Sequence, residues 1–158
     1  MGERIKLLLV DDEIFLCEQI SANVPWENYG IELIGYCDNA LDALDKMIDE
    51  MPDILITDIK MPVMNGLELI SRARQMNPFL QCIILSGYAE FTLAKAAIEQ
   101  GVKNYLLKPF SRTELESTLQ QCCVQLQKDR SEKKNEPSGE NGERIPAVSG
   151  AERSERSG

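Results

Sequence analysis

The feature that most constrains this fold is a set of short apolar runs, each followed by a polar residue. The first, Ile5–Val10, leads into two aspartates, and later runs lead into an aspartate, a serine and a lysine. Short runs that are mostly apolar are typical of strands buried on both faces of a parallel sheet. The residues at their ends, which predict one shared site, are Asp11, Asp12, Asp58, Ser86 and Lys108.

Helical patterns alternate with these runs. The expected strands are Ile5–Val10, Ile31–Cys37, Ile54–Thr57, Cys82–Leu85 and Tyr105–Leu107. Between them, apolar residues recur at helical spacing. The expected stripes of the first two helices are Ile14, Cys17, Ile20 and Val24, then Leu41, Leu44, Met47 and Ile48. The last helix is expected to begin at Ser111, because Glu114 completes a capping box, and its stripe is Leu115, Leu119, Cys122 and Leu126.

This alternation predicts a doubly wound α/β fold, in which five parallel strands carry helices on both faces. In open sheets of this kind, ligands bind beyond the carboxyl ends of the strands, where the winding direction reverses. The polar residues that follow the apolar runs all fall at such ends. Strand pattern and general binding rule therefore point to the same edge of the sheet.

Composition excludes several classes of function. The chain has no histidine, which removes Ser-His-Asp and Cys-His catalysis and histidine-based zinc sites. Residues 128–158 contain seven basic and seven acidic side chains, so residues 1–127 carry the whole net charge of −9. Nucleic acid phosphates would repel so acidic a domain, and we expect no direct binding to DNA or RNA.

The five cysteines are odd in number and form no CxxC pair. Together with the lack of an export signal, this predicts reduced, buried thiols in a cytoplasmic protein. No apolar run reaches the roughly 18 residues of a membrane span. We expect a single domain over residues 1–128, followed by a disordered polar tail over residues 129–158, which has too few apolar side chains to form a core.

Several residues at the strand ends have an ordinary structural interpretation as well as a chemical one. Asp11, Asp12 and Glu13 could hold Mg²⁺, or could belong to a solvated loop that caps a helix. Lys108 could neutralise a carboxylate or contact a phosphoryl oxygen, or be an exposed lysine before Pro109. Local sequence leaves these alternatives open. The ordinary interpretation of Ser86 is a polar turn residue, and that of Tyr105 is an aromatic side chain of the core.

Four motifs, taken together, resemble the response-regulator receiver domain of two-component signalling. They are VDDE at 10–13, ITDIKMPVMNG at 56–66, LSGYAEF at 85–91 and NYLLKPF at 104–110. The resemblance covers about residues 4–128 and implies a flavodoxin-like sheet with strand order 2-1-3-4-5. A weaker similarity, in residues 25–37 and 85–109, is to receivers of AraC-type regulators. Only the polar tail follows residue 128 in this sequence, and we expect either a single-domain regulator or part of a longer protein.

The resemblance implies a role for each matching residue. Asp58 would be the phosphoacceptor, and Mg²⁺ would be held by Asp11, Asp12, Asp58 and the backbone carbonyl of Lys60. Ser86 would be the switch hydroxyl, Lys108 the phosphate-contacting lysine and Tyr105 the aromatic switch. Lys60 stands where relatives often have a small residue, and Ser86 where many have threonine.

The implied function is a switch rather than a turnover enzyme. A sensor histidine kinase would phosphorylate Asp58, slow hydrolysis would reset it, and the surface of the fourth helix, fifth strand and fifth helix would control an output, expected to be transcription. That surface could also form a homodimer. Two alternatives are a small Mg²⁺-dependent phosphatase of the same fold class and a flavodoxin-type binding module, whose cofactor phosphate the acidic loop would repel.

Overall fold

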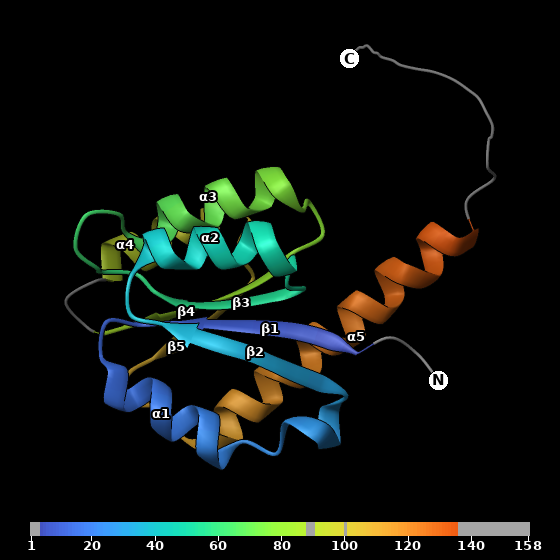
Figure 1. The fold of residues 1–158 in the computed structure, drawn as a ribbon, viewed down its shortest axis with the longest axis horizontal. Helices are drawn as coiled ribbons and strands as arrows, with labels where there is room; N and C mark the ends of the chain where they lie inside the picture. Colours follow the sequence, from blue (N-terminus) through green and yellow to red (C-terminus); the bar gives the residue numbers. More distant parts are fainter. Residues whose placement is uncertain (1–3, 88–90, 100, 136–158) are drawn as a thin grey trace, which may run out of the picture. The chain divides into compact units, whose positions relative to one another are not determined.

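The computed structural model describes residues 4–87, 91–99 and 101–135. Five strands form one parallel sheet in the order β2-β1-β3-β4-β5 (Figure 1). The strands are β1 (Ile5–Val10), β2 (Ile31–Cys37), β3 (Ile54–Asp58), β4 (Gln81–Ser86) and β5 (Asn104–Leu107). This arrangement confirms the predicted doubly wound, flavodoxin-like sheet.

Helices cover both faces of the sheet, as Figure 1 shows. They are α1 (Ile14–Asn23), α2 (Ala40–Glu50), α3 (Gly66–Met76), α4 (Phe91–Glu99) and α5 (Arg112–Asn135), with a short 3₁₀ helix, η1 (Trp26–Tyr29), before β2. Leu7 and Leu9 of β1 belong to the core that α1 and α5 complete, whereas Leu8 and Val10 belong to the core beneath α2, α3 and α4. Alternate residues of one strand thus supply two cores, which explains why apolar residues follow one another directly from Leu7 to Val10.

The start of α5 agrees closely with its sequence pattern. The Glu114 N–H donates to Ser111 Oγ at 3.0 Å, and the Ser111 N–H donates to Glu114 Oε1 at 2.8 Å. These two bonds form the predicted capping box, which satisfies donors that the first helical turn cannot. The predicted apolar stripe is also confirmed, since its four side chains are buried: Leu115, Leu119, Cys122 and Leu126.

The end of α5 differs from expectation. The helix continues to Asn135, so residues 129–135, which we expected to be disordered, are helical. Adding residues to an existing helix avoids the cost of nucleation, and this segment is rich in lysine, arginine and glutamate, which are good helix formers. Few apolar side chains are needed for such an extension. The remainder of the expected tail, residues 136–158, lies outside the described residues.

The expected inner faces of the first two helices were partly wrong. Ile14 of α1, and Leu41 and Ile48 of α2, leave 43%, 53% and 62% of their surface exposed. The buried residues of α2 are Ala40, Ala43 and Met47, of which Met47 was expected and the two alanines were not. Small alanine side chains allow a helix to lie close to a sheet. When both faces of a helix carry apolar residues, as in α2, the positions of the large ones alone predict the wrong buried face.

All five cysteines are buried and unpaired, as predicted. Burial raises the pKa of Cys17 to about 12 and that of Cys82 to about 11. These thiols therefore stay protonated near neutral pH and act as small apolar side chains. Of the helices in the described residues, none is both long enough and apolar enough to cross a membrane.

Gly66 allows the chain to fold back tightly after β3. Its N–H donates to the Ile59 carbonyl at 2.7 Å, and a Cβ built on it would lie 2.1 Å from the Asp58 carbonyl oxygen. No side chain fits there without moving the end of β3. The Asn65 side chain accepts from the Glu68 N–H at 2.9 Å and caps the helix that begins at this glycine.

We expect Gly66→Ala to lower the free energy of unfolding by about 3 kcal/mol, because relieving the overlap requires backbone movement. Gly30→Ala is the matched control. Gly30 has a φ of 68° but open space around its Cβ position, so alanine there should cost only about 1 kcal/mol of conformational strain. Urea denaturation measures both, and a Gly66→Ala cost no larger than that of Gly30→Ala would contradict the steric explanation.

Candidate functional site

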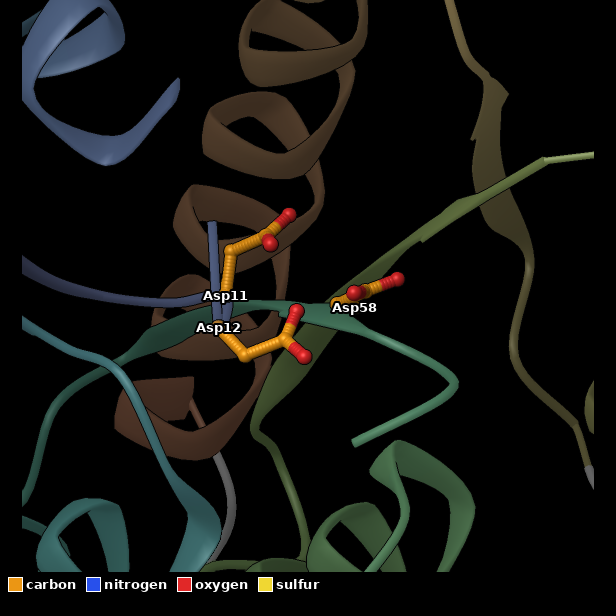
Figure 2. A group of neighbouring side chains, drawn as sticks. All are labelled: Asp11, Asp12 and Asp58. Carbon is orange, nitrogen blue, oxygen red and sulfur yellow. The ribbon is translucent and has the colours of Figure 1, made fainter. Parts of the chain in front are cut away.

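Three carboxylates meet at the carboxyl edge of the sheet, between β1 and β3. The two strands are direct neighbours, with Val10 paired to Thr57. Asp11 and Asp12 follow β1 and Asp58 ends β3, and each offers an oxygen atom within 4.8 Å of the others (Figure 2). Carboxylate oxygens in such a group are the ligands that Mg²⁺ and similar hard cations prefer.

The three carboxylates differ in their surroundings. Asp11 is fully buried and Asp58 leaves only 5% of its surface exposed, whereas Asp12 lies on the surface. The Asp11 Oδ1 accepts a hydrogen bond from the Glu13 N–H at 2.8 Å, and the Asp11 N–H donates to Cys37 O at 3.1 Å. Asp11 is therefore held rigidly, while Asp12 stands at the entrance to the site.

Lys108 brings one positive charge to these acids. Its Nζ lies 2.9 Å from Asp11 Oδ2, 3.2 Å from Glu13 Oε1 and 3.6 Å from Asp58 Oδ1. The backbone fixes this approach, because the Lys108 N–H donates to Ser86 O at 2.7 Å. The peptide bond between Lys108 and Pro109 is cis.

A single ammonium does not neutralise the site, and the pKa values reflect this imbalance. Burial, followed by the negative charge of Asp11, raises the pKa of Asp58 to about 7, despite the opposing effect of Lys108. Burial also raises the pKa of Asp11. For Lys108, burial alone would lower the pKa, but the hydrogen bond to Asp11 and the nearby negative charges outweigh it and raise the pKa. The site thus favours an additional cation.

Ser86 ends β4, the strand next to Asp58, with Asp58 paired to Leu85. Its side chain is 1% exposed, and its Oγ has no hydrogen-bond partner among the described residues. A buried hydroxyl without a partner is costly, and it can donate to an acceptor that enters the site. By contrast, the neighbouring buried hydroxyl of Thr57 donates to the Asp58 carbonyl at 2.9 Å.

Tyr105 lies in β5, an edge strand of the sheet, and is 41% exposed. The side chain of the next residue, Leu106, enters the core beneath α1 and α5. Because side chains alternate along a strand, Tyr105 points to the other face, which α4 covers. It is a half-exposed aromatic side chain outside the carboxylate cluster.

The site opens into a cavity of about 620 Å³. It is lined by Asp12, Glu13, Asp58, Lys60, Met61, Pro62, Gly87 and Lys108. The structure thus brings together the predicted acids, Lys60 and Lys108, with Ser86 on the adjacent strand. Sequence reasoning considered Glu13 only as one of three adjacent acids that could hold a cation, and did not anticipate its contact with Lys108. It also did not anticipate Met61 and Pro62 in the wall.

Comparison with known proteins identifies the family. The family model "Response regulator receiver domain" matches residues 7–120. A transcriptional regulatory protein of Bacillus subtilis, YesN, is 41% identical over 129 residues, covering 82% of this chain and 35% of that protein. The transcriptional regulatory protein HptR of Staphylococcus aureus is 34% identical over 114 residues, covering 72% of this chain and 44% of that protein. The chain spans less than half the length of these relatives.

Solved structures agree with the sequence relatives. The receiver domain of AraT, a response regulator from Geobacillus stearothermophilus, superposes with a TM-score of 0.76 at 31% identity, covering 80% of this chain and 98% of that one. A two-component transcriptional regulator AraC from Clostridium phytofermentans has the same TM-score and coverage at 28% identity. The similarity to AraC-type receivers noted in the sequence is therefore supported. With its sheet order, acidic strand ends and these matches, the chain belongs to the response regulator receiver domain family.

Proposed function

We propose that this receiver accepts a phosphoryl group on Asp58 from a phosphohistidine of a sensor histidine kinase. The observation that carries the proposal is the position of the Asp58 carboxylate. It is nearly buried, yet it lines the open cavity and lies within 3.6 Å of the Lys108 ammonium. An acceptor oxygen is thus available beside a group that can balance phosphoryl charge.

The proposed transfer needs few groups. An Asp58 carboxylate oxygen attacks phosphorus, a P–O bond forms, and the P–N bond to the kinase imidazole breaks, so that neutral histidine leaves after protonation. Lys108 offsets the charge that spreads over the phosphoryl oxygens. Later, a water molecule attacks phosphorus, inorganic phosphate leaves and the Asp58 carboxylate is restored. The protein mainly positions and neutralises, and it turns over no other substrate.

The residues at the site suit Mg²⁺. The proposed ligands are one oxygen from each of Asp11, Asp12 and Asp58, together with the backbone carbonyl of Lys60, a residue that lines the same cavity. The raised pKa of Asp58 supports this, since it reflects burial first and then the negative charge of Asp11, which Lys108 alone does not compensate. When bound, the ion would withdraw charge from the transferring phosphoryl oxygens.

Ser86 and Tyr105 are the proposed switch residues. The buried Ser86 Oγ, which lacks a partner among the described residues, would donate to a phosphoryl oxygen on Asp58. Its movement would leave space on the α4 side of β5 that the half-exposed Tyr105 ring can enter. Such a change biases the surface of α4, β5 and α5 between two states. Exposed apolar side chains of α4 and β5, Ile98 and Leu107, belong to that surface.

The proposed output is control of transcription in the cytoplasm, since the named relatives are transcriptional regulatory proteins. A phosphorylation-dependent homodimer through α4, β5 and α5 is a compatible route. The alternative of a small phosphatase receives no support from the comparisons. Turnover of small phosphate esters, measured with Mg²⁺, would be expected only of such an enzyme.

Asp58→Asn should abolish covalent labelling by acetyl phosphate in Mg²⁺, because an amide oxygen is not an effective nucleophile. Intact-mass spectrometry detects the added phosphoryl group. Asp49→Asn is the control, because Asp49 is an exposed acid on α2 whose loss changes the net charge equally. Undiminished labelling of Asp58→Asn would refute the assignment of the acceptor.

Without Mg²⁺, the protein should lose about 2 kcal/mol of stability between about pH 5.5 and pH 7.5. The folded-state pKa of Asp58 is raised from 3.8 to about 7, so within this window the folded state keeps a proton that the unfolded state has lost. Raising the pH therefore favours unfolding. The absence of histidine leaves few other side chains that titrate in this range.

Urea denaturation in EDTA across this pH range measures the effect. Asp58→Asn should flatten the dependence and be more stable than the wild type at the upper end, because its side chain stays neutral. Adding Mg²⁺ should stabilise the wild type most at high pH, where the carboxylates are ionised. A wild-type protein whose stability rises with pH in EDTA would show that the burial of Asp58 is not the dominant effect.

A further inference from the structure

Glu13 shares Lys108 with the reacting site. The Lys108 Nζ lies closer to Glu13 Oε1, at 3.2 Å, than to Asp58 Oδ1, at 3.6 Å. The Glu13 side chain, which is 65% exposed, makes no capping hydrogen bond although the residue stands at the N-terminus of α1. Its contact with Lys108 is therefore not required to begin that helix.

The two carboxylates that compete with Asp58 for this ammonium differ in kind. Asp11 is fully buried, and its other oxygen is fixed by the Glu13 N–H at 2.8 Å. Its pairing with Lys108 is shielded from water and costly to break. The Glu13 carboxylate lies in solvent, where an ion pair is weak and easily exchanged. Glu13 is thus the partner of Lys108 that an incoming phosphoryl group can displace.

We propose that Glu13 is a positioning residue, whose carboxylate draws the Lys108 ammonium toward the mouth of the site and slows phosphorylation of Asp58. The inference rests on the proposed function. Each phosphoryl transfer requires Lys108 to exchange its contact with Glu13 for one with the phosphoryl oxygens. Because an exposed ion pair is weak, its removal should accelerate labelling by about two- to fivefold, and no more.

A second effect of Glu13 must be separated from this one. Its negative charge also repels an anionic phosphoryl donor, so neutralising it would speed labelling without any role for Lys108. Donor repulsion persists when Lys108 is replaced, whereas positioning of Lys108 does not. A double-mutant cycle between the two residues distinguishes the effects.

The experiment compares labelling rates with acetyl phosphate and Mg²⁺ in the wild type, Glu13→Gln, Glu13→Asp and Lys108→Gln, and in the double variant. We expect Glu13→Gln to be about two- to fivefold faster than the wild type. Glu13→Asp, with a shorter side chain of the same charge, should fall between them. In the Lys108→Gln background, Glu13→Gln should have no effect. Glu18→Gln, on the exposed side of α1, controls for net charge and should match the wild type.

NMR titration of the same variants with beryllofluoride and Mg²⁺ measures their affinity for a phosphoryl mimic. This gives the double-mutant cycle a second readout, which remains measurable in a variant that acetyl phosphate labels too slowly. An equal gain from Glu13→Gln with and without Lys108 would overturn the proposal, as would no gain when the wild type labels normally. Failure of the wild type itself to acquire a phosphoryl group would instead overturn the proposed function. Unchanged urea midpoints verify that the Glu13 variants fold normally.

Discussion

The burial of more negative charge than one ammonium can balance is the constraint on which this site depends. Asp11 and Asp58 lie almost out of contact with water, and Lys108 is the cation that forms ion pairs with them among the described residues. A protein core tolerates such charge only when another group compensates it. The raised pKa of Asp58, the fit to a divalent cation and the attraction of Lys108 all follow from this one imbalance.

The fold maintains this costly arrangement because the surrounding sheet is so well packed. β1 and β3 run side by side at the point where the winding direction reverses, and their side chains fill two separate cores. Backbone hydrogen bonds then hold each strand end in place. Gly66 allows the chain to turn directly beneath Asp58, and the backbone bond from Lys108 to Ser86 aligns the lysine with the neighbouring strand. Rigid supports of this kind hold reactive side chains in a fixed geometry.

Much of this could be predicted from the chain because the decisive signals are local. Mostly apolar runs identified the strands, and the capping box located the start of α5 to within a residue. Prediction failed where a residue's surroundings come from distant segments. Leu41 and Ile48 of α2 have the same apolar character as core residues, yet the small side chains of Ala40 and Ala43 set which face meets the sheet. The contact between Glu13 and Lys108 joins residues 95 positions apart.

The sequence by itself determined the alternation of strands and helices, the acidic character of the strand ends and the absence of histidine chemistry, because composition and periodicity depend only on the order of residues. Only the tertiary structure decided the burial of each charged side chain and the distances between them. Burial and distance separate Asp11, fixed in the interior, from Asp12 at the entrance, and place Lys108 nearer to Glu13 than to Asp58. Charge interactions vary with separation and with access to water, and both arise only when the chain has folded.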